Sequence, residues 1–263
     1  MQTFDFQDGN GPVPAHRHTN PDGTQGGWVA DTAEVAETAY VGPEALVYGQ
    51  ALVSGNARVY EQAQVSGNAQ VSGHAQVFGE ARVSGNAQVS ENTRVFGHAR
   101  VSEETRVSGN ARVSGNAQVF GDAWVYEQAR VSGNAQVSGD AQVSGDARVS
   151  GYAHVSGNTR VFGQARVSGY VRVSGEAWVS GQARVSGNTQ IYLSALTRGT
   201  HTTSPFQAQI GRYQAIFDGE ELRVGCCSYP LAYWAQHVEE VGDLRKATPE
   251  ETQLVKRIVQ ALI

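Results

Sequence analysis

The chain repeats one pattern of apolar and polar positions every six residues over most of its length. From residue 29 to residue 191, every sixth position holds Val, except the last, which is Ile191. A typical unit is Ala111-Arg112-Val113-Ser114-Gly115-Asn116. Ala precedes nearly every Val by two places, and the exceptions include Thr93, Thr105, Thr159, Thr189 and Val171. A fixed period of this kind predicts a solenoid, in which each repeat packs against its neighbours.

The order of residues within one unit predicts a short strand followed by a corner. Ala and Val are two places apart, so a strand points both inward and points the polar residue between them outward. Ser-Gly-Asn follows as the corner, where Gly tolerates the backbone angles of a sharp bend. Three units close a triangular coil of 18 residues, with Ala filling the narrow places near the axis. The 28 units from residue 29 to residue 194 make a little over nine coils. With strands about 4.8 Å apart, they predict a rod on the order of 45 Å long.

The recurring sequence Val-Ser-Gly-Asn-Ala-Arg resembles the bacterial hexapeptide repeat, in which a small residue follows an aliphatic one by four places. The resemblance covers all 28 units and implies a left-handed parallel β-helix, an exception to the usual right-handed crossover. The segments 9–18 and 26–33 also resemble hexapeptide-repeat proteins of phages and prophages. This second resemblance implies an accessory protein that blocks or sequesters a component of host defence.

Three regions are expected. Residues 1–28 form a lead-in or cap, residues 29–194 the β-helix, and residues 195–263 a small α/β domain that caps the rod or mediates oligomerisation. The fold class is therefore an all-β solenoid with a small C-terminal α/β domain. In the last region we expect two strands, Tyr213–Phe217 and Leu222–Val224, around a turn at Asp218-Gly219. A helix is expected over Leu231–Val241. A last helix should begin at the capping box Thr248-Pro249-Glu250-Glu251.

The composition gives little direction about partners. The net charge of −5 exerts no overall attraction toward nucleic acid or acidic membranes. Cys226 and Cys227 are adjacent, so we expect buried thiols rather than a framework disulfide or a CxxC site. Neither a signal peptide nor an apolar run near the ~18 residues of a membrane helix is evident, which predicts a cytoplasmic protein, in the host cytoplasm if phage-encoded.

Sorting the outward residues by the 18-residue period reveals a row of arginines. Seven of eight successive coils carry Arg at one position on one side of the prism, and Gln76 is the interruption. The row consists of Arg58, Arg94, Arg112, Arg130, Arg148, Arg166 and Arg184. One interpretation is a binding stripe for a polyanion or an acidic protein surface. The other is that the gene grew by duplicating 18-residue turns, so that a solvated Arg recurs. The use of Arg in every case, never Lys, favours recognition.

Outward aromatic residues also recur at corresponding places. Tyr60, Phe78 and Phe96 follow one another along one edge of three adjacent coils, and Tyr152 and Tyr170 occupy corresponding positions further on. Such rows stiffen a β-helix by stacking. Alternatively, they form a contact surface or a subunit interface.

The sequence does not reproduce the catalytic or zinc-binding residue patterns of known hexapeptide-repeat enzymes. Acyltransferases of this family have an extruded loop and a catalytic His near a subunit boundary, whereas no loop interrupts the 28 units. His74, His98 and His154 lie on different sides without a partner in the pattern, and they do not reproduce the three zinc ligands of hexapeptide carbonic anhydrases. His16 and His18 alternate on one strand, but two ligands alone make a poor zinc site. We therefore assign no catalytic residue, metal or cofactor.

The leading hypothesis is a non-enzymatic, rigid binding or scaffold protein that presents its Arg side or aromatic edge to a partner. The partner is expected to be a protein or an anionic ligand, with nucleic acid as a further candidate and no membrane. The chain is expected to form a homo-oligomer, either a dimer or a trimer. Two alternatives remain: an acyltransferase-like protein with a site between subunits, and a self-assembling structural rod.

Overall fold

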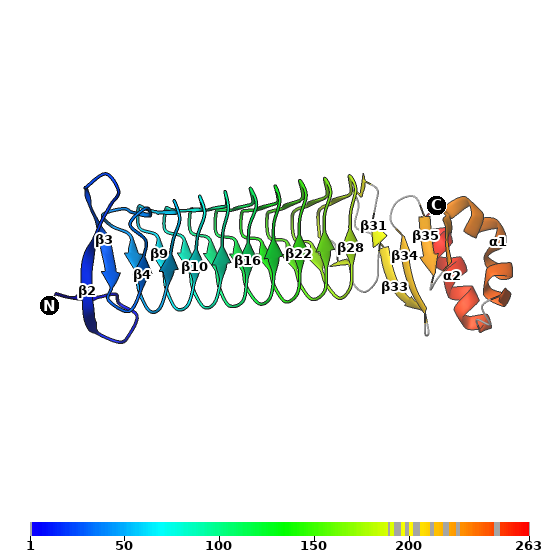
Figure 1. Ribbon diagram of the computed structural model, residues 1–263. Helices are drawn as coiled ribbons and strands as arrows, with labels where there is room; N and C mark the ends of the chain where they lie inside the picture. The colour runs from blue at the N-terminus through cyan, green and yellow to red at the C-terminus, as the bar shows by residue number, and fades with distance from the viewer. Residues whose placement is uncertain are drawn as a thin grey trace.

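The computed structural model describes the backbone of residues 2–188, 190–191, 196–197, 200–201, 206–210, 213–217, 221–224, 227–244 and 248–262. Residues 29–188 wind into a rod of triangular coils, and a hairpin region precedes them (Figure 1). Each coil contributes one two-residue strand to each of three parallel sheets, so strands three apart in chain order are neighbours. The predicted solenoid of three hexapeptides per coil is confirmed.

Sheet 1 carries two additional antiparallel strands at its N-terminal end. It contains β1 (Thr3–Asp5), β2 (Pro12–Thr19), β3 (Gln25–Ala30), β6 (Leu46–Val47), β9 (Gln64–Val65), β12 (Arg82–Val83), β15 (Arg100–Val101), β18 (Gln118–Val119), β21 (Gln136–Val137), β24 (His154–Val155), β27 (Arg172–Val173) and β30 (Gln190–Ile191).

Sheets 2 and 3 form the other two sides of the rod. Sheet 2 contains β4 (Glu34–Val35), β7 (Leu52–Val53), β10 (Gln70–Val71), β13 (Gln88–Val89), β16 (Arg106–Val107), β19 (Trp124–Val125), β22 (Gln142–Val143), β25 (Arg160–Val161), β28 (Trp178–Val179) and β31 (Leu196–Thr197). Sheet 3 contains β5 (Tyr40–Val41), β8 (Arg58–Val59), β11 (Gln76–Val77), β14 (Arg94–Val95), β17 (Arg112–Val113), β20 (Arg130–Val131), β23 (Arg148–Val149), β26 (Arg166–Val167), β29 (Arg184–Val185) and β32 (Thr200–His201).

The core of the rod is a continuous column of Val and Ala side chains. From Val41 to Val185, these inward residues are at most 1% exposed. Where Thr replaces Ala, its hydroxyl finds a local acceptor. Thr93 Oγ1 donates to the carbonyl of Ser90 at 2.7 Å, and Thr105 Oγ1 donates to that of Ser102 at 2.6 Å. The buried hydroxyl is thus satisfied, which is why the column tolerates Thr.

The corners need a left-handed backbone conformation and close approach between coils. Gly115 has a φ of 68°, and a Cβ there would lie 3.0 Å from the backbone N and O of Gly133 in the next coil. Four corners of the solenoid hold a glutamate in this conformation instead: Glu61, Glu91, Glu103 and Glu127. Glu103 Oε2 accepts a hydrogen bond from the Gly121 N–H at 2.8 Å, which offsets part of the backbone strain.

The hairpin of β2 and β3 folds over the first coil. Val41 N–H donates to Asn20 Oδ1 at 2.8 Å, and His18 Nε2 lies 3.0 Å from the carbonyl of Ala39. Both side chains are buried, at 3% exposure for Asn20 and 7% for His18. Side chains of the lead-in therefore occupy the edge of β5, where a preceding coil would otherwise bind.

The C-terminal region contains a four-stranded antiparallel sheet and two helices. The elements are β33 (Phe206–Ile210), β34 (Tyr213–Phe217), β35 (Glu221–Val224), β36 (Cys227–Pro230), α1 (Leu231–Leu244) and α2 (Pro249–Leu262). Buried Trp234 of α1 donates its indole N–H to the carbonyl of Leu222, and Cys227 is buried beside them.

The two predicted strands and both predicted helices of this region are confirmed, and α1 extends three residues beyond the expected end. Sequence analysis missed β33 and β36. The predicted turn at Asp218-Gly219 and Cys226 lie outside the described residues. Neither described helix is long and apolar enough to cross a membrane.

Candidate functional site

Sheet 3 presents an unbroken row of six exposed arginines on six adjacent strands. The strand pairs place Arg94 beside Arg112, Arg112 beside Arg130, and so on to Arg184. All six are exposed. We call this row the arginine face: Arg94, Arg112, Arg130, Arg148, Arg166 and Arg184. Arg58 lies on the same sheet but is separated from Arg94 by Gln76. The strand register thus places these arginines in one row, and a binding role for the row stays a prediction.

The positive charge of the arginine face is not neutralised within the solenoid. No carboxylate of residues 2–188 lies within ion-pair distance of any of its six guanidinium groups. Two unit charges about 5 Å apart repel by roughly 1 kcal/mol in water. Arg58 differs, because its guanidinium lies over the rings of Tyr40 and Tyr60, at 5.0 and 5.5 Å from their centroids. The face thus keeps an electrostatic potential available to an external anion.

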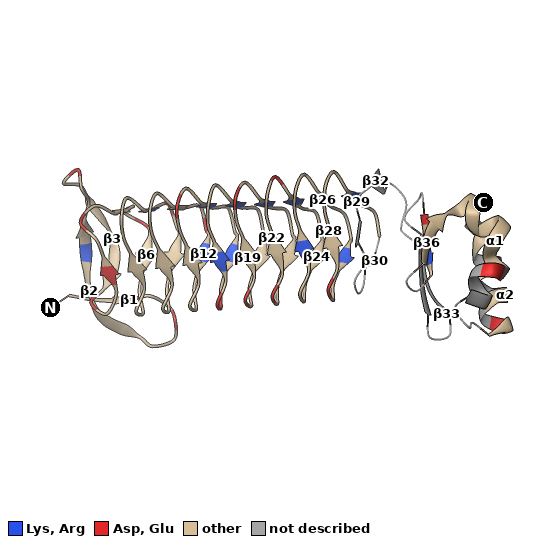
Figure 2. Ribbon diagram, turned by 45° about the vertical axis from the view of Figure 1, so that its right-hand side comes forward, with Lys and Arg blue, Asp and Glu red and all other residues tan. Residues whose placement is uncertain are grey.

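Acidic residues gather at the corner between sheets 1 and 2. Between residues 94 and 184, five of seven carboxylate side chains lie at this corner and are exposed. We call them the acidic edge: Glu103, Glu104, Asp122, Asp140 and Glu176. In a triangular coil, the corner between sheets 1 and 2 lies opposite sheet 3. Figure 2 shows the blue strands of sheet 3, among them β26 and β29, and a series of red corners along the lower margin of the rod, with further red at some upper corners.

Two stacked aromatic rows run along the edge between sheets 3 and 1. The ring centroids of Tyr60 and Phe78 are 4.9 Å apart, and those of Phe78 and Phe96 are 5.0 Å apart, with interplanar angles of 3°. Tyr152 and Tyr170 stack likewise at 4.9 Å. The first row is half-buried, and this burial raises the pKa of Tyr60 above its ordinary value. Both rows are therefore stacked along the rod, and a role for them as a contact surface stays a prediction.

Sequence analysis did not identify an aromatic recess on sheet 2. Its volume is about 200 Å³, and it is lined by Tyr126, Gln142, Ser144, Arg160, Phe162 and Trp178. The Arg160 guanidinium lies 5.1 Å from the Trp178 ring centroid. Ser144 occupies the same corner position as Tyr126 and Phe162, one coil from each. Sorting this corner by the 18-residue period would have revealed the missing ring.

One histidine has a partner that the sequence analysis did not recognise. His98 Nδ1 lies 3.2 Å from Glu80 Oε2, and Glu80 precedes it by one coil of 18 residues. The expectation that His98 lacks a nearby partner was therefore wrong. Both side chains are about 60% exposed, and they line an open recess of about 630 Å³ together with Tyr40, Glu44 and Tyr60. No loop extrudes from the coils between residues 29 and 188 to enclose this pair.

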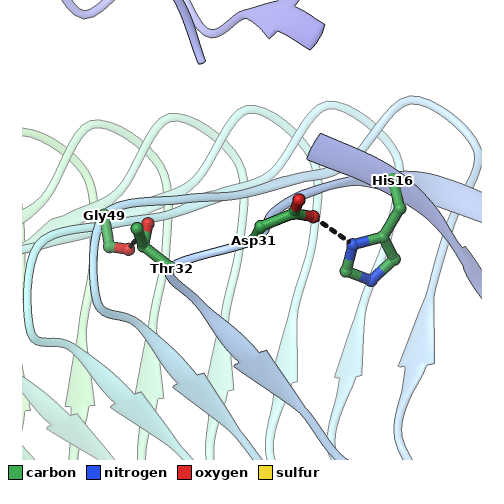
Figure 3. A network of polar contacts seen from close by, with 4 residues as sticks. All are labelled: His16, Asp31, Thr32 and Gly49. Atoms are coloured by element: carbon green, nitrogen blue, oxygen red, sulfur yellow. Dashed lines mark hydrogen bonds and ion pairs between the residues drawn. The ribbon is translucent and has the colours of Figure 1, made fainter. Parts of the chain in front are cut away.

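The two histidines of β2 point to different partners. His16 Nδ1 lies 2.8 Å from Asp31 Oδ1 on the surface, close to a bond from the Thr32 hydroxyl to the carbonyl of Gly49 (Figure 3). His18 is engaged with the carbonyl of Ala39 instead. Across the described part of the chain, no group of three or more His, Cys, Asp or Glu residues could hold a metal ion.

Comparison with known families relates the solenoid to two kinds of repeat. The family model for bactofilins, described as polymer-forming cytoskeletal proteins, matches residues 87–211. A second model, the YdcK beta-solenoid repeat, matches residues 75–91. The bactofilin match spans the whole arginine face. No curated protein sequence matches the chain.

Two solved structures of acyltransferases resemble the chain only distantly. The UDP-N-acetylglucosamine O-acyltransferase of Moraxella catarrhalis is 16% identical, with a TM-score of 0.26, covering 61% of this chain and 69% of its own. The UDP-N-acetylglucosamine acyltransferase of Francisella novicida is 13% identical, with a TM-score of 0.29, covering 88% of this chain and 78% of its own.

Proposed function

We propose that this chain is a self-assembling structural rod that polymerises with copies of itself. The observation that carries the proposal is the match of residues 87–211 to a family of polymer-forming cytoskeletal proteins. This match favours the structural-rod alternative over the binding or scaffold hypothesis that led the sequence analysis. The matching families do not support the phage resemblance.

The regularity of the rod supports the proposal. Between residues 29 and 188, every coil has three strands and no inserted loop, so a contact made at one coil can be repeated at the next. Repetition of this kind lets weak contacts add along a long interface. A stiff rod of uniform cross-section is a suitable building unit for a filament.

The first coil adds a second line of support. β4 is the last strand of sheet 2, and no described strand pairs with its outer side. Ala33 and Val35 on this coil are only half-buried against the core. An exposed strand edge of this kind is a template for pairing with another chain. The adjacent β5 edge, in contrast, is occupied by His18 and Asn20.

A second candidate function is the binding of an external anionic partner. The observation that favours it is the arginine face, whose six guanidinium groups have no carboxylate of residues 2–188 within ion-pair distance. The partner would be an acidic protein or a polyanion. Binding of an external anion requires a molecule other than the chain, whereas self-assembly requires only the chain itself, so the two functions can be distinguished with the purified protein.

Sedimentation velocity of the purified, nuclease-treated chain over a range of concentrations tests the proposal. We expect large species whose fraction rises with protein concentration in the absence of any other macromolecule. A single small species at every concentration would contradict the proposal. If that species also bound an added DNA duplex, the second candidate function would replace it.

A further inference from the structure

We infer that rods of this protein associate side by side, with the acidic edge of one chain seated on the arginine face of a second copy. The inference rests on the proposed self-assembly and names the surfaces that carry one of its contacts. Three features of the rod support it: the placement of charge around it, the spacing of charge along it and the relative position of the two surfaces.

The two surfaces carry opposite charges over the same stretch of the rod. The arginine face extends from Arg94 to Arg184, and the acidic edge extends from Glu103 to Glu176. All of these side chains are exposed. Glu103 Oε2 accepts a hydrogen bond from the Gly121 N–H, and Glu104 Oε1 accepts one from Asn86 Nδ2, so both carboxylates are partly engaged within the rod. Glu104, Asp122 and Asp140 follow one another on adjacent coils. Guanidinium and carboxylate groups form strong, directional pairs.

The spacing of the charges is identical on both surfaces. Each is set by the 18-residue coil: Arg112, Arg130 and Arg148 recur with the same period as Glu104, Asp122 and Asp140. Stacked rings on adjacent coils, at 4.9 to 5.0 Å, show how far apart successive coils lie. Two rods aligned along their length therefore bring a carboxylate next to a guanidinium at successive coils. Asn158 interrupts the acidic edge at one coil.

The position of the two surfaces determines the form of the assembly. The acidic edge lies across the rod from the arginine face (Figure 2), so two rods cannot exchange both contacts with each other. Each rod offers its face to one neighbour and its edge to another. A head-to-tail contact of this type does not close and continues as an open row. The expected product is a flat sheet or a bundle in which the rods lie side by side with their long axes aligned.

A second copy fits the arginine face better than a nucleic acid does. The chain supplies its own complementary surface at the spacing of one coil, whereas the phosphates of duplex DNA recur at about 3.4 Å per strand along the helix axis. The contact between exposed charges is screened by salt, because the Debye length falls to about 3 Å at 1 M. Side-by-side association should therefore weaken steeply as ionic strength rises.

The experiment reverses charge on each surface of the full chain, separately and in mixture. The face variant carries Arg112→Glu, Arg130→Glu and Arg148→Glu. The edge variant carries Glu104→Arg, Asp122→Arg and Asp140→Arg. The matched control changes three exposed arginines of sheet 1, in Arg82→Glu, Arg100→Glu and Arg172→Glu. Light scattering and negative-stain electron microscopy of nuclease-treated samples report bundling, and circular dichroism verifies that each rod is folded.

We expect the face variant and the edge variant each to raise the protein concentration needed for bundling by roughly tenfold or more. An equal mixture of the two should restore bundling, because the reversed face then meets the reversed edge. The control should bundle like the unmodified chain. A variant that fails to fold is replaced by the mixture of milder Arg130→Glu and Asp122→Arg chains, for which the same restoration is expected.

Three outcomes would overturn the inference. If both variants still polymerise and bundle like the unmodified chain, the arginine face and the acidic edge do not mediate bundling, and the proposed function still holds. Loss of binding to an added DNA duplex in the face variant, with bundling unchanged, would assign the arginine face to a polyanion. Absence of any self-association in the unmodified chain would overturn the proposed function together with this inference.

Discussion

Arg130 on β20 and Arg148 on β23 are register partners, so two positively charged side chains project side by side from adjacent coils. Like charges directly opposite one another destabilise a sheet. Replacing Arg130 by Gln should raise the free energy of unfolding of dilute, unassembled rods by a few tenths of a kcal/mol at low salt. Urea unfolding at low and high salt measures the change.

The control is Arg172→Gln, because Arg172 on β27 pairs with His154 and Gln190 rather than with arginine. It should leave the stability of the rod nearly unchanged. The gain in Arg130→Gln should also vanish at high salt, where exposed charges are screened. An equal gain in both variants, or a gain that persists at high salt, would argue against repulsion along the face.

Gly115 holds a corner that no residue with a Cβ fits easily. Gly115→Ala should lower the free energy of unfolding by roughly 1–2 kcal/mol, because the φ of 68° is strained for Ala and the new Cβ meets the Gly133 backbone. Thermal and urea unfolding measure the loss. Asn110→Ala, at an exposed corner position, is the matched control and should change stability by less than about 0.5 kcal/mol. Equal effects would show that the corner does not require Gly.

The fold was predictable from the sequence because each hexapeptide repeats the same physical arrangement. Val113 and Val131 are 18 residues apart and become register partners, as the period requires. The same arithmetic placed the arginines and the aromatic rows. The lead-in has no period, so the contacts of His18 and Asn20 with the first coil could not be derived. They depend on β2 folding back over β5.

The site was less predictable because it depends on side chains in neighbouring columns. The pair of Glu80 and His98 was accessible in principle, since the two residues are one period apart. The recess beside Ser144 depends on how Phe162 and Trp178 orient, with their rings 6.4 Å apart at 77°. The sequence does not specify these rotamers. That the acidic edge lies on the opposite side of the rod from the arginine face follows only once each corner is assigned to the two sheets that it joins.

Ser144 interrupts a row that begins at Tyr126 and resumes at Phe162. These two rings are two coils apart, about 10 Å by the strand spacing, which leaves space for one ring between them. Ser144→Phe should raise the free energy of unfolding by about 0.5–1.5 kcal/mol by stacking on both neighbours. Ser90→Phe is the control, because its neighbours in the same column are Ser72 and Ser108. An equal gain in the control would attribute the effect to general burial rather than to the stack.

Asn20 holds the first coil through its bond from the Val41 N–H. Asn20→Ala should leave that buried N–H without its acceptor and cost about 1–3 kcal/mol. Hydrogen exchange of the Val41 amide should accelerate, while exchange of amides in the central coils stays unchanged. Asn10→Ala, in the exposed lead-in, serves as the control. Unchanged protection of Val41 in the Asn20 variant would contradict a capping role for this side chain.

The central claim is that the chain alone forms polymers of its rods. Negative-stain electron microscopy of the purified, nuclease-treated chain tests it most directly, at low salt where contacts between charged surfaces are strongest. We predict filaments, sheets or bundles in which narrow rods lie aligned and which lengthen or widen with protein concentration. Fields of separate short rods at every concentration would contradict the claim.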